Sequence, residues 1–156
     1  MSWTTLQRQN RVRPHTTSRR ELDDLRAVIK RDLADAAIPN LSADRRFATA
    51  YNAALQAATM TVACAGYRVA GTGHHQTCFE AMELAVGSPE ASTLAAYFET
   101  CRRKRNAVDY DTANVITDTE VADILVEAEN LRLLVEAWIA NNHPHFAPPP
   151  DMPPSP

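Results

Sequence analysis

The sequence predicts an all-α protein, an up-and-down bundle of four or five helices, and three observations support this class. Hydrophobic residues make up 45% of the 156-residue chain, and alanine is prominent among them. Only 4 glycines are present, and runs of valine, isoleucine and threonine that are typical of strands are nearly absent. Apolar residues instead recur at spacings of three and four, the period of an amphipathic helix. At this length we expect one domain with a sizeable core.

The first 17 residues are polar and basic and contain Pro14, so residues 1–17 are expected to form a flexible arm. Ser18 followed by Glu21 is a capping-box pattern that opens a helix. This helix continues to about Ala37, and Pro39 and Asn40 follow it as chain breakers. Its apolar stripe comprises Leu22, Leu25, Ile29, Leu33 and Ala36.

Two further helices are predicted in the middle of the chain. Ser42 is the expected N-cap of an alanine-rich helix that ends near Ala65, with Gly66 as a left-handed C-terminal residue. A glycine-containing loop, 71–73, separates it from a shorter helix that begins near His74. The composition of the alanine-rich helix is typical of a central helix that packs on several sides.

The last two helices have clear start signals. Ser88 can cap the first of them, and the Pro89 that follows suits a first helical turn. Thr117 and Glu120 form a second capping box, which opens a helix through about Ala140. The bundle therefore spans residues 18–141. The tail, residues 142–156, contains most of the chain's 10 prolines and is expected to be disordered.

Composition excludes several classes of function. The net charge of −3 argues against broad electrostatic binding of nucleic acid, so any contact must come from a local patch such as 102–105. The 3 cysteines form no CxxC pair and are expected to be buried and reduced. No metal or cofactor motif is present, and we expect neither a metal nor a cofactor. Without a membrane-length apolar run or a signal-peptide core, we expect a cytoplasmic protein with no membrane contact.

Arg105 is the strongest functional candidate in the sequence. It follows Leu94, Phe98 and Cys101 in the apolar stripe of the fourth predicted helix, whereas the three basic residues 102–104 point elsewhere. A guanidinium on a core-facing stripe is costly unless it meets carboxylate or phosphate acceptors. Arg105 is therefore expected to face a ligand, a partner, or acidic neighbours such as Asp109.

His74 and His75 open the third predicted helix. Neighbouring helical residues do not share a face, so the pair is poorly placed to bind one metal ion. One interpretation is that one histidine is hydrogen-bonded and the other exposed. The alternative is that one of them supplies an acid–base imidazole to Arg105.

Three segments of the chain resemble the HEPN superfamily (higher eukaryotes and prokaryotes nucleotide-binding). They are Tyr51 to Tyr67, Gly71 to Glu80, and the core from Lys104 to Tyr110. The resemblance covers about residues 20 to 140. It implies a small helical bundle. The active members of the superfamily are metal-independent RNases. Their motif is an arginine, four to six residues, and a histidine.

In this resemblance Arg105 matches the motif arginine, Asn106 matches the polar residue that often follows it, and Tyr110 stands at the histidine position. The histidine of active members is thought to activate the ribose hydroxyl or to orient the phosphate. Tyrosine has an unperturbed pKa near 10 and is a poor base at neutral pH, although it can donate a hydrogen bond to a phosphate. Active members also dimerise, which implies a homodimer with two arginine motifs in one groove. Arg105 could then be neutralised by Asp109 or Asp111, or by those residues of a second subunit.

Three functions remain open at this point. The leading hypothesis is a HEPN-fold component of a prokaryotic toxin–antitoxin or defence system. It would bind RNA or a nucleotide and a partner protein, such as a nucleotidyltransferase or an antitoxin, as a dimer. The second is an active metal-independent endoribonuclease in which His74 or His75 supplements Arg105, Asn106 and Tyr110. The third is a purely structural dimerisation module.

Overall fold

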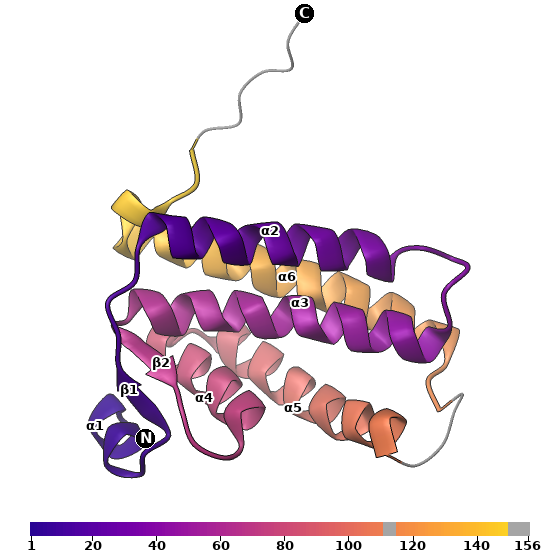
Figure 1. Cartoon of the computed structure of the whole chain (residues 1–156), viewed down its shortest axis with the longest axis horizontal. Helices are drawn as coiled ribbons and strands as arrows, with labels where there is room; N and C mark the ends of the chain where they lie inside the picture. The colour runs from indigo at the N-terminus through magenta and orange to yellow at the C-terminus, as the bar shows by residue number, and fades with distance from the viewer. Residues whose placement is uncertain (111–114, 150–156) are drawn as a thin grey trace, which may run out of the picture.

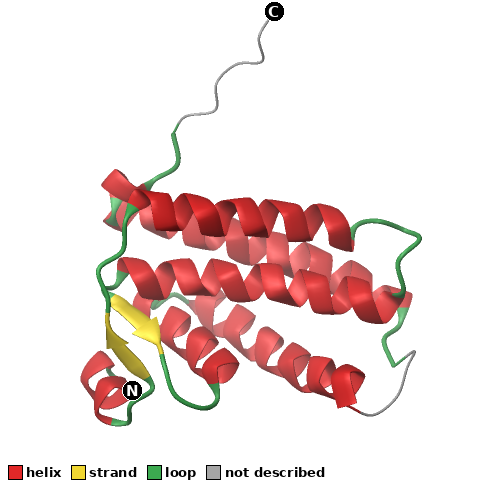
Figure 2. Ribbon diagram, viewed as in Figure 1, coloured by secondary structure: helices red, strands yellow, loops and turns green. Residues whose placement is uncertain are grey.

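The structure is all-α, as the sequence predicts (Figures 1 and 2). It is a computed structural model that describes residues 1–110 and 115–149, without the side chains of 107–110. Within these residues a small two-stranded sheet and two short helical segments accompany the bundle. The bundle helices are α2 (Arg19–Ala36), α3 (Ala43–Cys64), α4 (His74–Val86), α5 (Pro89–Tyr110) and α6 (Asp118–Asn142).

Helix α3 is the centre of the bundle. In Figure 1, α2 and α6 lie on one side of it and α4 and α5 on the other, and α3 contacts all four. Its small alanine side chains allow this close approach on several faces. The core contains large side chains from α3, α4 and α5 that are almost fully buried, among them Phe47, Phe79 and Phe98.

The predicted helix starts are confirmed, although of the two expected capping boxes only that of Thr117 and Glu120 is complete. Ser18, Ser42, Ser88 and Thr117 each accept a hydrogen bond from the backbone N–H three residues later, at 3.1–3.2 Å. These side chains satisfy amides that have no partner within the helix. Gly66 has a φ of 95°, the left-handed geometry that the sequence predicts after α3.

The expectation of a flexible arm over residues 1–17 is wrong. Helix α1 (Trp3–Arg8) and strand β1 (Val12–Pro14) occupy this segment, and β1 pairs antiparallel with strand β2 (Tyr67–Val69). Leu6 is fully buried, and it packs in a second small core together with Val12, Val62 and Ala81.

This N-terminal segment is also tied to α4 by polar contacts. The Arg11 Nε donates to Thr77 Oγ1 at 3.0 Å, and the Arg11 guanidinium forms an ion pair with Glu80. Trp3 stacks on Tyr67, with ring centroids 4.6 Å apart. The partners are more than 60 residues away in the sequence, so periodicity within the segment does not predict the contacts.

The start of the proline-rich tail is also ordered, contrary to expectation. Helix α6 continues to Asn142, and Pro144–Phe146 forms a short 3-10 turn, η1, against it. The Arg26 guanidinium donates to the Phe146 carbonyl at 2.7 Å, and the Trp138 and His143 rings lie 5.0 Å apart. The predicted tail beyond residue 149 lies outside the described residues.

Candidate functional site

A surface cleft of about 460 Å³ brings together the residues that the sequence singles out; we call it the Arg105 cleft. It lies between the N-terminus of α4, with the loop before it, and residues 102–106 of α5. Arg105, Asn106, His74 and His75 all line it, although about 30 residues separate the two pairs. The remaining lining residues are Gly71, Thr72, Gly73, Gln76 and Arg102.

Arg105 lies at the edge of the core. Leu94, Phe98 and Cys101 of the predicted stripe are buried, whereas Arg105 is half-buried, one turn further along α5. Its guanidinium carbon is 5.5 Å from the centre of the Tyr51 ring, a cation–π distance. The side chain is therefore supported from below by an aromatic face while it lines a cleft open to solvent.

Tyr51 is the residue that sequence reasoning did not assign to the site. It is fully buried on α3, and its ring lies 5.7 Å from the His75 ring and 5.8 Å from Phe79. Its hydroxyl has no hydrogen-bond partner among the described residues. Burial raises the pKa of this phenol well above 10, and the nearby Arg105 charge opposes that shift. Tyr51 is therefore a neutral platform under Arg105. A phenol among the alanine side chains of α3 was the available signal.

The N-terminus of α4 faces the same cleft. Its N-cap is Gly73, which has a φ of 73° and provides no side-chain hydrogen bond, and the first turn contains no acidic residue. The first amides of a helix carry partial positive charge and lack partners within the helix. A 13-residue helix with this uncapped start, next to Arg105, favours an anion in the cleft.

The two histidines differ in environment. His74 is exposed, whereas His75 is half-buried beside Tyr51. Burial, followed by the positive charge of Arg105, lowers the pKa of His75 below its ordinary value. His75 is thus neutral near pH 7 in the free protein, so it can donate one hydrogen bond and accept another.

Arg102 also belongs to the site. Its position outside the apolar stripe of α5 had predicted only a solvated side chain. It is half-buried and donates two hydrogen bonds to Glu99, at 3.0 and 2.6 Å. This pairing raises the pKa of Arg102 and lowers that of Glu99. Arg103 and Lys104 are exposed, as expected, and neither lines the cleft.

The final part of the predicted motif is not described. Asn106 is half-buried and lines the cleft. Tyr110 is the last residue of α5, and its side chain lies outside the described residues, as do the side chain of Asp109 and all of Asp111. The described part of the motif is therefore its arginine and the amide that follows.

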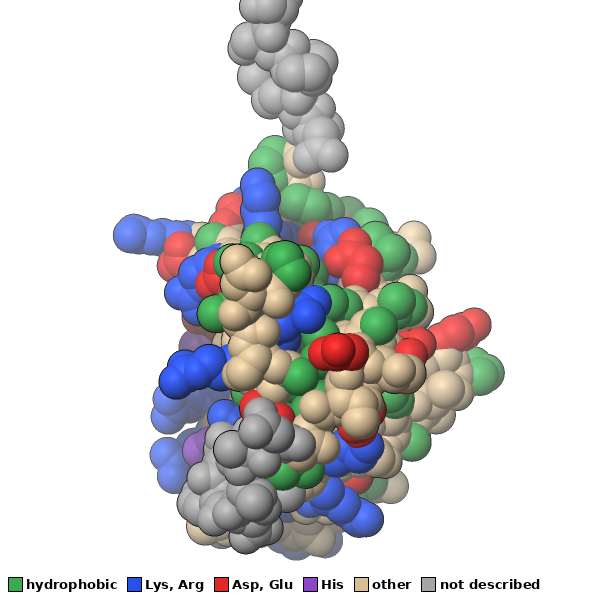
Figure 3. Space-filling view, turned by 90° about the vertical axis from the view of Figure 1, so that its right-hand side faces the viewer, with side chains coloured by type: hydrophobic (Ala, Val, Ile, Leu, Met, Phe, Trp, Pro, Cys, Tyr) green, Lys and Arg blue, Asp and Glu red, His purple; other side chains and the backbone are tan. Residues whose placement is uncertain are grey.

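Basic side chains gather locally on the protein surface. In the end view of Figure 3, several lysine and arginine side chains lie along the left edge, with histidine among them. Acidic side chains are more frequent toward the right of the same view. A local patch of this kind can attract a phosphate even though the whole chain has a net charge of −3.

Two further features concern the described residues as a whole. No group of three or more His, Cys, Asp or Glu residues there is arranged to hold a metal ion. No helix in the same residues is long and apolar enough to cross a membrane. The chemistry that the described residues of the Arg105 cleft offer is hydrogen-bond donation, positive charge and a neutral imidazole.

Comparison with known proteins identifies the family. A family model described as SAV_6107-like HEPN matches residues 37–136, well over half of the chain. The matched range includes α3, α4 and α5, and with them the lining of the Arg105 cleft. Searches of curated proteins and of solved structures gave no match. Because this match covers well over half of the chain, the chain belongs to the SAV_6107-like HEPN family.

Proposed function

We propose that the Arg105 cleft binds a phosphate group of RNA or of a nucleotide, and that the protein is a binding component of a prokaryotic toxin–antitoxin or defence system. The observation that carries this proposal is the meeting of Arg105 with the uncapped N-terminus of α4. Both features favour an anion, and they come from different parts of the chain.

The chemistry of the cleft suits a phosphate in particular. A guanidinium can bind two phosphate oxygens at once, and helix amides provide further donors. The Asn106 amide and the neutral His75 ring supply further hydrogen-bond donors. A phosphate has more acceptor oxygens than a halide or a carboxylate and can bind more of these donors at once. The phosphodiester of RNA and the phosphates of a nucleotide share these features, so the test includes both.

The family resemblance supports a homodimer and a partner protein as parts of the same proposal. Two copies that place their Arg105 clefts side by side would double the positive charge available to a polyanion. A nucleotidyltransferase or an antitoxin is the proposed protein partner. Co-purification of the full chain with the products of neighbouring genes tests that part. Light scattering tests the dimer independently of any ligand.

The decisive experiment is RNA binding by fluorescence polarisation with the wild-type chain, Arg105→Ala and Arg103→Ala. Arg103 is the matched control, because it lies two residues away, is exposed and does not line the cleft. Arg105→Ala should weaken binding about tenfold or more, as expected for the loss of a charge-assisted contact. Arg103→Ala should change it by less than about threefold, and inorganic phosphate or a nucleotide should compete. Equal effects of the two variants would contradict a specific site.

An active ribonuclease is the second candidate, and one observation favours it. His75 lines the same cleft as Arg105, so an imidazole lies near the arginine that the resemblance assigns to the motif. This candidate predicts RNA cleavage in the presence of a chelator, abolished by Arg105→Ala and by His75→Ala. Tight RNA binding without cleavage would leave binding as the function. If neither occurs and Arg105→Ala lowers only stability or dimerisation, the protein is a structural module.

A further inference from the structure

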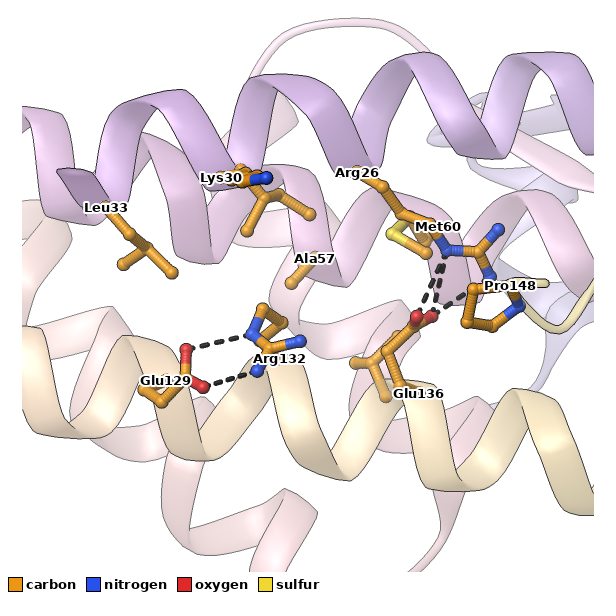
Figure 4. A pocket seen from close by; sticks show the side chains of 11 residues that line it. Arg26, Lys30, Leu33, Ala57, Met60, Glu129, Arg132, Glu136 and Pro148 are labelled. Atoms are coloured by element: carbon orange, nitrogen blue, oxygen red, sulfur yellow. Dashed lines mark hydrogen bonds and ion pairs between the residues drawn. The ribbon is translucent and has the colours of Figure 1, made fainter. Parts of the chain in front are cut away.

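A second cleft lies on the opposite side of α3 from the Arg105 cleft. Helices α2 and α6 both pack on α3 but contact one another only weakly, so a hollow of about 650 Å³ remains between them (Figure 4). We call it the Lys30 cleft. Pro148 closes one end. Its apolar lining consists of Ile29, Leu33, Ala57, Met60, Val135 and Pro148.

The rim of the Lys30 cleft contains two ion pairs, and within each pair the arginine and the carboxylate neutralise one another. The Arg26 guanidinium binds the Glu136 carboxylate at 3.0–3.2 Å, and Arg132 Nε binds Glu129 at 2.8 Å. Figure 4 shows both pairs at the mouth of the cleft. These contacts raise the pKa of Arg132 and lower that of Glu129. Both carboxylates are therefore committed and leave little capacity for a cation.

Lys30 is the remaining charge. It is exposed on α2, lines the cleft, and has no ion pair or hydrogen bond with a side chain among the described residues. Three cations and two carboxylates line the cleft, and Arg26 also pairs with the Asp23 carboxylate at 2.8 Å. Lys30 is therefore the one cation of the lining that has no carboxylate partner among the described residues. That single positive charge stands at the rim of an otherwise largely apolar hollow.

We propose that the Lys30 cleft binds a small amphipathic monoanion, a molecule with an aliphatic or aromatic body and one carboxylate, sulfonate or phosphate group. The apolar body would occupy the hollow against Met60 and Leu33, and the anionic group would pair with Lys30. A volume of about 650 Å³ lies within the range of small-molecule sites, about 300–1,000 Å³. A polyanion such as RNA fits poorly, because only one cation of the cleft is uncommitted.

The test uses two fluorescent probes of nearly equal shape, 1-anilinonaphthalene-8-sulfonate and its uncharged relative N-phenyl-1-naphthylamine. Wild-type protein should bind the sulfonate with saturation at one site per chain. Lys30→Glu should weaken sulfonate binding about tenfold or more while it leaves the neutral probe within about threefold. Lys30→Arg keeps the charge and should retain the affinity for both probes.

Two further variants keep the proposal falsifiable. Arg13→Glu makes the same charge change at an exposed residue of β1 outside both clefts, and should bind both probes as the wild type does. Leu33→Trp adds bulk at the half-buried rim and should weaken both probes. Circular dichroism must show each variant folded. Equal sulfonate affinity in Lys30→Glu and wild type, or an equal loss in Arg13→Glu, would overturn the proposal. RNA should not compete with the probe, so this result is independent of the Arg105 cleft.

Discussion

The guanidinium carbon of Arg105 lies 5.5 Å above the centre of the Tyr51 ring, at the boundary between the core and the cleft. Tyr51 itself is fully buried, and His75 contacts another part of the same ring. A cation held over an aromatic face keeps its charge while part of its hydration is removed. One buried tyrosine of α3 thus orients groups from both α4 and α5.

The ring of Tyr51, rather than its hydroxyl, should support Arg105. Tyr51→Phe removes a buried hydroxyl that has no partner among the described residues, so the free energy of unfolding should stay equal or rise slightly. Tyr51→Leu removes the aromatic face and should weaken RNA binding by about three- to tenfold. Thermal unfolding and fluorescence polarisation measure the two effects. Equal losses of affinity in both variants would assign the role to the hydroxyl instead.

Stability should fall as the pH drops below about 6.5, because His75 has a lowered pKa in the folded protein. In that range the unfolded chain binds more protons than the folded one, so protonation favours unfolding. His143, whose pKa burial also lowers, should contribute to the same window. Urea unfolding at pH 7.5 and 5.5 should therefore show a smaller pH effect in His75→Gln and the smallest in His75→Gln/His143→Gln. If the free energy of unfolding of the double variant depends on pH as strongly as that of the wild type, the two histidines are not the cause.

Binding at the Arg105 cleft should show the opposite pH dependence. A bound phosphate next to His75 favours the imidazolium and raises its pKa, so ligand affinity should increase as the pH falls from 7.5 to 6. Polarisation titrations across this range, with His75→Gln as the comparison, measure the effect. The variant should lose most of the increase. If affinity is independent of pH in the wild type, His75 does not contact the bound anion.

Gly71 and Gly73 should respond differently to alanine, although both have positive φ. A Cβ on Gly71 would lie 2.9 Å from the backbone oxygen of Asn10, whereas nothing lies within 4 Å of a Cβ on Gly73. Gly73→Ala should cost about 1–2 kcal/mol, the left-handed penalty alone. Gly71→Ala should cost more and should speed hydrogen exchange at the Ala70 amide, which donates to the backbone at Arg11. An equal loss of unfolding free energy in the two variants would mean that the backbone at Asn10 shifts without cost to accommodate the added methyl group.

The thiols of Cys64, Cys78 and Cys101 should be unreactive in the folded protein. All of them are buried and free of disulfides, as expected from the sequence, and burial raises the pKa of each to about 11. The thiolate is the reactive form, so a disulfide reagent at pH 8 should label none of them in the native state. After denaturation it should label all 3. Rapid native labelling of any one would indicate local opening.

The start of α6 should depend on its capping box. The Thr117 hydroxyl accepts from the Glu120 amide, and the Glu120 carboxylate accepts in return from the Thr117 amide, both at 3.1 Å. Thr117→Ala should lower the free energy of unfolding by about 1 kcal/mol. Thr119→Ala, two residues along and exposed, should change it by less than about 0.5 kcal/mol. Denaturant unfolding measures both, and a similar loss in the two variants would argue against the cap.

The bundle helices could be predicted because their signals are local. A capping serine or threonine, a periodic apolar stripe and a terminating glycine lie within one segment, as they do from Ser42 to Gly66. The N-terminal segment has no such period, and its order depends on contacts such as Leu6 in a pocket formed by distant residues. The ordered turn at Pro144–Phe146 likewise depends on the Arg26 guanidinium from α2.

The same distinction applies to the candidate site. By itself the sequence determined the all-α class, the helix boundaries and the choice of Arg105 as the unusual charge, because each depends on spacing along one helix. Only the tertiary structure decided that Arg105 rests on Tyr51 and faces the N-terminus of α4. The tertiary structure also places Arg102 in the lining of the cleft, whereas the helical period predicted that its side chain would be solvated. A periodic pattern specifies which face a residue occupies, whereas the partner of that face depends on how α3, α4 and α5 pack together.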